Sequence, residues 1–192
     1  MQEEEKKKLE EKKTLLKNKL EAEVFFRDHI YEMLELAGSL KEAGIPVEVE
    51  YIKVREELLP FLQTIINNKA GKFDAAHFCL QPEIHFQLEL EKRFPSVNAF
   101  RYVPDLPVFE AFDDEGLNIK DKLPDEFLIQ GENVFIFYTN FSVVLRTGFS
   151  EFVNNIPLFT GLPYDFCMVN AGFTRLLVRT LEGDWHLYTD KK

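Results

Sequence analysis

Residues 133–155, NVFIFYTNFSVVLRTGFSEFVNN, and residues 164–188, YDFCMVNAGFTRLLVRTLEGDWHLY, decide the fold. Runs of β-branched and aromatic residues predict strands at 133–139, 141–147, 164–169, 173–180 and 185–189. We also expect one or two turns of helix at 149–155, capped by Ser150. Strands joined by short turns pair antiparallel, so this third of the chain predicts an antiparallel meander.

The first part of the chain predicts one long helix. Residues 1–23 are rich in Lys, Glu and Leu, and form a charged, solvated helical extension of the domain at 24–192. The same helix then gains an apolar stripe that packs on the domain, made of Val24, Phe26, Ile30, Leu34 and Ala37. Gly38, Gly44 and Pro46 end it.

Four further segments complete the predicted fold. Residues 46–54 alternate as a half-buried strand, and residues 56–69 form a helix with Pro60 in its first turn. Strands are expected at 73–80 and 83–91, with a short extended piece at 100–103. The fold class is therefore α+β: a long N-terminal helix and a second helix pack on a mainly antiparallel sheet that ends in a C-terminal β-meander.

Charge excludes some partners and permits others. The 192 residues have a net charge of −10, whereas residues 1–23 contain seven Lys and seven Glu, which cancel. Phosphate backbones and anionic lipid surfaces need a cationic face, so nucleic acid and membrane are not expected partners. No apolar run reaches membrane-spanning length, and the N-terminus lacks the apolar core of a signal peptide. We therefore expect a cytoplasmic protein, or one delivered by a route without a cleavable signal.

Residues 104–126 hold the strongest charge feature, with eight acidic residues against two lysines. Its prolines argue against regular secondary structure. An acidic field that surrounds aromatic rings suits a surface that receives a basic protein partner. We therefore predict a partner-binding site made of Asp105, Phe109, Glu110, Phe112, Asp113, Asp114 and Glu115.

Two groups of residues suggest a chemical role, and packing in the core is the simpler explanation of both. His77, Cys79 and His85 lie within nine residues and are zinc-ligand types, but a structural zinc site needs a fourth ligand. Cys167 lies in an apolar run typical of a core thiol, although a distant base such as His186 would make it a nucleophile. No phosphate-binding loop or hydrolase motif occurs, so the sequence favours a protein without catalytic residues, metal or cofactor.

The strand, strand, short helix and strand pattern of residues 132–189 resembles the acidic α+β immunity proteins that bacteria pair with polymorphic or contact-dependent toxins. The resemblance implies a cytoplasmic protein that neutralises a toxin by masking its active site. It rests on the order of elements, so it assigns no functional residue.

Two alternative functions and one structural alternative remain open. An enzyme or zinc protein built around His77, Cys79 and His85 is the first of these. Residues 5–43 could form a homo-oligomer through the N-terminal helix, which would make this a structural or assembly protein. Arg146, Arg175 and Arg179 could pair with the acidic segment inside the molecule, which would leave less charge for a partner.

Overall fold

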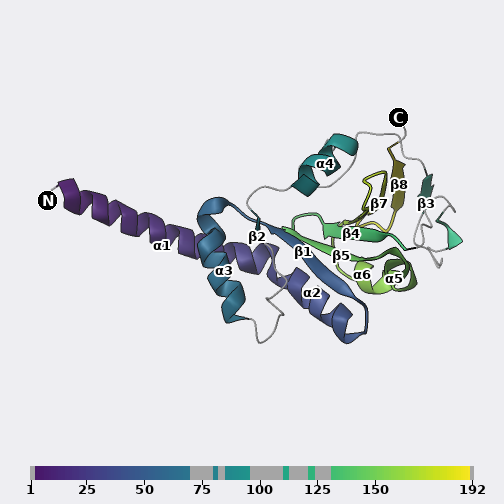
Figure 1. The fold of residues 1–192 in the computed structure, drawn as a ribbon, viewed down its shortest axis with the longest axis horizontal. Coiled ribbons are helices and arrows are strands. Elements are labelled where there is room, and N and C mark those ends of the chain that lie inside the picture. The colour runs from purple at the N-terminus through teal and green to yellow at the C-terminus, as the bar shows by residue number, and fades with distance from the viewer. Residues whose placement is uncertain are drawn as a thin grey trace.

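A largely antiparallel sheet forms the centre of the molecule in a computed structural model (Figure 1). The structure describes residues 3–69, 80–81, 85–95, 110–112, 121–123 and 131–190. Within these residues the sheet has eight strands in the order β2-β1-β5-β4-β6-β7-β8-β3, and only β1 and β2 pair in parallel. The strands are β1 (Val47–Lys53), β2 (Leu80–Gln81), β3 (Glu110–Phe112), β4 (Asn133–Tyr138), β5 (Val143–Gly148), β6 (Phe166–Asn170), β7 (Arg175–Arg179) and β8 (Trp185–Thr189). The predicted α+β class is confirmed.

The C-terminal strands form where the sequence predicts them, but they do not make one continuous meander. β4 lies between β5 and β6, whereas β6, β7 and β8 follow one another along the sheet and form the predicted C-terminal meander. Two short helices, α5 (Phe149–Asn154) and α6 (Ile156–Thr160), carry the chain from β5 to β6. β4 is apolar on both sides, and a central position allows both sides to be covered.

Alternation along β4 divides the core between the two faces of the sheet. The other helices are α1 (Glu3–His29), α2 (Tyr31–Glu42), α3 (Leu59–Asn68) and α4 (His85–Arg93). Val134, Ile136 and Tyr138 are buried on the first face, with α2, α3, α5, α6 and the end of α1. Phe135 and Phe137 are half-buried on the second face, where α4 packs. The sheet is therefore covered by helices on both sides.

The predicted single N-terminal helix is instead two helices, with a break at Ile30 (φ −126°). An unbroken helix would bond the His29 carbonyl to the N–H of Met33. Here the Met33 N–H bonds to the Ile30 carbonyl at 3.1 Å, and the His29 carbonyl accepts from the Ser142 N–H at 3.1 Å. The β4–β5 connection thus supplies the donor that the helix would otherwise give to the His29 carbonyl. The sequence around residue 30 does not reveal this distant contact.

The predicted strand at 83–91 is wrong, because the structure has helix α4 there. The i, i+4, i+8 spacing of Phe86, Leu90 and Phe94 is the pattern that decides it. Leu90 and Phe94 are buried and Phe86 is half-buried against the second face, whereas Leu88 is 62% exposed. The alternation of apolar residues at 84, 86, 88 and 90 is incidental to this packing.

Several smaller predictions have outcomes as well. Residues 56–58 form a 3₁₀ turn ahead of α3, and Pro60 lies in the first turn of α3 as predicted. Gly148 is the N-cap of α5 and no side chain caps it, so the assignment of Ser150 as the cap is wrong. The predicted strand at 73–80 lies outside the described residues except at Leu80, in β2, and the extended piece at 100–103 lies entirely outside them.

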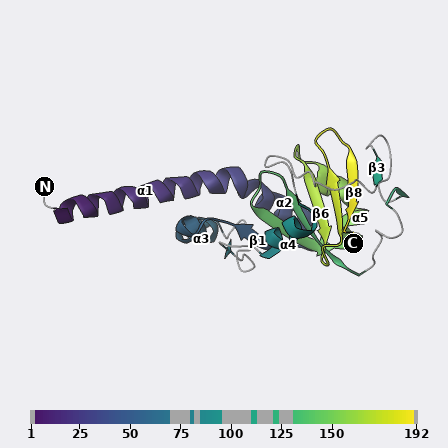
Figure 2. The same cartoon turned by 90° about the horizontal axis from the view of Figure 1, so that it is seen from above.

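The N-terminal helix extends well beyond the sheet and the other helices. Every residue from 3 to 17 is exposed, and α1 projects from the rest of the molecule in two perpendicular views (Figures 1 and 2). Among the described residues, none of the helices is both long enough and apolar enough to cross a bilayer.

Candidate functional site

Cys167 lies at the centre of the sheet and is fully buried on β6. Burial, reinforced by the nearby Asp165 carboxylate, raises the pKa of the Cys167 thiol well above its usual value. The registers of β6, β7 and β8 place His186 in line with Cys167 across the sheet, with Val178 between them. Two strand spacings separate these positions by about 10 Å. His186 is too far away to serve as a base, so Cys167 is a core thiol.

The zinc hypothesis gains no support from the described residues. His77 and Cys79 lie outside them, and His85 is known only as the first residue of α4. Over residues 3–69, 80–81, 85–95, 110–112, 121–123 and 131–190, no three His, Cys, Asp or Glu side chains group as metal ligands do.

Three residues of the predicted partner-binding segment lie at one edge of the sheet, as the described residues define it. Its residues 110–112 form β3, which pairs antiparallel with β8: Glu110 opposite Leu187, Ala111 opposite His186, and Phe112 opposite Trp185. β3 is the last strand in the sheet order, whose opposite edge is β2 (Figure 1). The expectation of no regular structure throughout 104–126 is therefore wrong at β3, where β8 supplies the hydrogen bonds.

The other proposed site residues fall outside the described part of the chain: Asp105, Phe109, Asp113, Asp114 and Glu115. Glu110 and Phe112 are placed by their backbone alone. The structure thus locates the middle of the acidic segment and its neighbour β8, and the site remains a prediction.

Arg146 is one of the three arginines that could neutralise the acidic segment. It lies on β5 and makes ion pairs with two glutamates of the adjacent β1, Glu48 and Glu50; the Nε to Oε2 distance to Glu50 is 2.9 Å. Arg175 and Arg179 share the strand parity expected for them, on the same side of β7 as Leu177, and both are half-buried. The charge of Arg146 is therefore used locally, five strands away from β3 in the sheet order.

A second candidate binding surface lies on α1. Its C-terminal part is held to the body by buried Ala22 and Phe26, and by Arg55, whose guanidinium donates to the Glu21 carboxylate at 2.6 Å. This hydrogen bond lowers the pKa of Glu21. The helix nevertheless exposes large apolar side chains: Leu9, Leu15, Leu16, Leu20 and Val24. Val24 is 48% exposed, so its assignment to the packed stripe is wrong, whereas Phe26, Ile30, Leu34 and Ala37 are buried.

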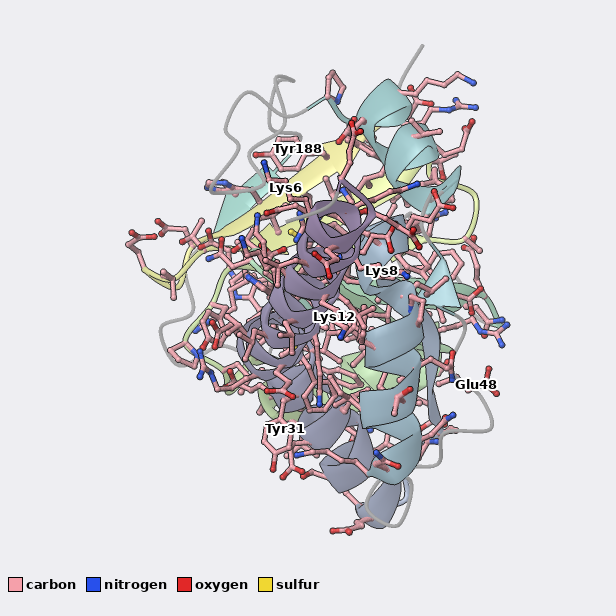
Figure 3. The ribbon with its side chains drawn as sticks, turned by 90° about the vertical axis from the view of Figure 1, so that its left-hand side faces the viewer. Lys6, Lys8, Lys12, Tyr31, Glu48 and Tyr188 are labelled. Carbon is pink, nitrogen blue, oxygen red and sulfur yellow. The ribbon has the colours of Figure 1, made fainter. Side chains whose placement is uncertain are left out.

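The sequence contains a signal for most of these exposed residues, which is their helical spacing. Leu9, Leu16, Leu20 and Val24 follow one another at intervals of seven, four and four, which places them on one side of a helix. Figure 3 views the molecule along α1 and labels Lys6, Lys8 and Lys12 on it.

Comparisons of the chain with protein-family models, with curated proteins and with solved structures found no match.

Proposed function

We propose that this protein is a non-catalytic binding protein whose acidic segment receives a basic protein partner and masks part of that partner's surface. The observation that carries the proposal is the pairing of β3 with β8, which fixes the middle of the segment at the edge of the sheet. The segment around it supplies the charge, with eight acidic residues against two lysines in residues 104–126.

Electrostatics support this assignment in two ways. A concentrated negative field accelerates the approach of a cationic partner and gives binding a strong dependence on salt. Arg146 pairs with Glu48 and Glu50 in the structure, so one of the arginines available to neutralise the segment already has two local partners.

The state of Cys167, the candidate nucleophile that lies in the described part of the chain, supports a function without catalysis. Cys167 is buried with a raised pKa, and His186 stands about two strand spacings from it. We propose a toxin as the partner, because the immunity proteins that residues 132–189 resemble act by masking a toxin. Masking needs no catalytic group in the protein that binds.

A pull-down with two matched baits tests the proposal. The first bait carries Asp113→Asn, Asp114→Asn and Glu115→Gln, and the second carries Glu3→Gln, Glu4→Gln and Glu5→Gln. Both changes remove three negative charges, but the second lies at the exposed tip of α1. We expect the wild-type and α1-tip baits to capture the same basic protein, identified by mass spectrometry, and the first bait to lose it. Equal capture by all three baits would contradict the assignment.

A further inference from the structure

We infer that α1 pairs with α1 of a second copy of this chain in an antiparallel arrangement. The surface involved is the leucine stripe, defined as Leu9, Leu16, Leu20 and Val24. Their exposed fractions are 45%, 61%, 62% and 48%, respectively. This inference concerns a different surface from the acidic segment, so either proposal can fail without the other.

The stripe lies on the side of α1 that points away from the body. At 3.6 residues per turn, its four side chains fall within about 80° of the helix circumference. Six residues of α1 near its C-terminal end are buried or half-buried and are centred on nearly the opposite side: Asn18, Glu21, Ala22, Phe25, Phe26 and His29. The molecule's own packing therefore uses the far side of α1 and leaves the stripe for another chain.

The charges that flank the stripe favour a second copy of the same helix. We align the copies so that Leu9 of each faces Leu20 of the other. Helical geometry then brings Glu10 beside Lys17 of the second copy, and Lys8 beside Glu23. Twofold symmetry repeats each contact. The unfavourable approach of Lys12 to Lys19 is outnumbered by these pairs. Lys13 falls within the arc of the stripe, but its long side chain reaches out to Glu10 at 2.9 Å.

A parallel pair lacks this complementarity. In register, it would set Glu5 against Glu10 of the second copy and Lys12 against Lys17, so like charges would meet along both flanks. It would also place the two bodies side by side, although residues 24–192 carry the whole net charge of −10. Antiparallel helices put the bodies at opposite ends, and separations beyond about 8 Å are largely screened at physiological salt.

The helix also meets the length requirement of such a contact. Residues 5–24 would overlap over about 30 Å, at a rise of about 1.5 Å per residue. Because α1 is continuous with the packed part of the molecule through Ala22 and Phe26, the costly nucleation of the helix takes place within one chain.

Light scattering on the full chain over a concentration series tests the pairing. We expect the mass to rise from 22.5 kDa toward twice that value. Leu16→Glu should weaken the dimer about tenfold or more, because it places a charge in the contact. Leu15→Glu is the matched control: Leu15 is 60% exposed, against 61% for Leu16, and points about 100° away. A single-chain mass at every concentration, or equal effects of the two substitutions, would overturn the inference.

A charge exchange tests the orientation. Glu10→Lys and Lys17→Glu should each weaken the antiparallel dimer, because each sets like charges together. An equimolar mixture of the two variants should restore the dimer. In the mixed dimer, the two substituted side chains face each other with opposite charge. The native Lys17 of one variant and the native Glu10 of the other form the second favourable pair. In a parallel pair, Glu10→Lys would instead strengthen the dimer by facing Glu5. A dimer strengthened by Glu10→Lys alone, or a mixture no tighter than its components, would overturn the antiparallel arrangement.

Discussion

The backbone N–H of Ser142, in the β4–β5 connection, donates a hydrogen bond to the carbonyl of His29 at the end of α1. On the same connection, the carbonyl of Asn140 lies 2.7 Å from Nδ1 of His29. These contacts join two segments about 110 residues apart and coincide with the break between α1 and α2. The conformation of Asn140, with φ +74°, is therefore needed to position both the Asn140 carbonyl and the Ser142 N–H against His29.

Substitution of Asn140 tests this role of the connection. Asn140→Val should lower the free energy of unfolding by about 1–3 kcal/mol, because a β-branched residue is strained at positive φ. Asn140→Gly is the control and should change it by less than about 1 kcal/mol, since glycine adopts this conformation freely. Urea unfolding followed by circular dichroism measures both. Equal losses for the two variants would show that the backbone conformation is not the cause.

Phe86 should be the main contact of α4 with the second face of the sheet. Its ring centroid lies 5.2–5.7 Å from four other rings: those of Tyr51, Phe135, Phe137 and Phe173. We expect Phe86→Ala to destabilise the protein by about 2–4 kcal/mol. Leu88→Ala, on the same helix but 62% exposed, should cost less than about 1 kcal/mol in the same urea experiment.

Similar losses for the two substitutions would contradict helix α4. In a strand, residues 86 and 88 would share one face, and the two substitutions would have similar effects.

This helix also shows where prediction from the sequence stops. Apolar residues at 84, 86, 88 and 90 match the period of a strand, while Phe86, Leu90 and Phe94 match that of a helix. Only the aromatic second face, assembled from β1, β4 and the residues before β7, selects the helical spacing. The C-terminal strands were predictable because their β-branched and aromatic composition agrees with their packing.

The acidic segment shows a similar limit. Three residues of β3 are too few for a periodic signal, and their partners in β8 lie more than 70 residues further along the chain. The composition of the segment was readable as a candidate site, but its attachment to the sheet edge was not. Likewise, the order of β5, β4 and β6 depends on the crossover through α5 and α6, which a series of short turns does not indicate.

Stability should fall at alkaline pH. Burial raises the pKa of Tyr138, Tyr51 and Cys167 above their usual values. Above about pH 9 for Cys167 and about pH 10 for the two tyrosines, the unfolded chain loses these protons while the native state keeps them. The native state then binds more protons, so the free energy of unfolding decreases as pH rises, by about 1.4 kcal/mol per pH unit for each group.

Tyr138→Phe isolates one of these groups. At neutral pH it should cost about 1 kcal/mol, because the Tyr138 hydroxyl donates to the carbonyl of Phe159. Above pH 10 its stability should fall less steeply than that of the wild type, by about 1.4 kcal/mol per pH unit. Urea unfolding at a series of pH values gives both numbers. Parallel curves for the two proteins would contradict a buried, protonated Tyr138.

The most direct test of the proposed function is the affinity for the captured partner as a function of salt. We predict that wild-type binding weakens steeply as salt rises, and that Asp113→Asn, Asp114→Asn and Glu115→Gln together reduce both the low-salt affinity and this dependence. The α1-tip variant with three neutralised glutamates should behave like the wild type. The same affinity and the same salt dependence for all three proteins would contradict an acidic binding segment.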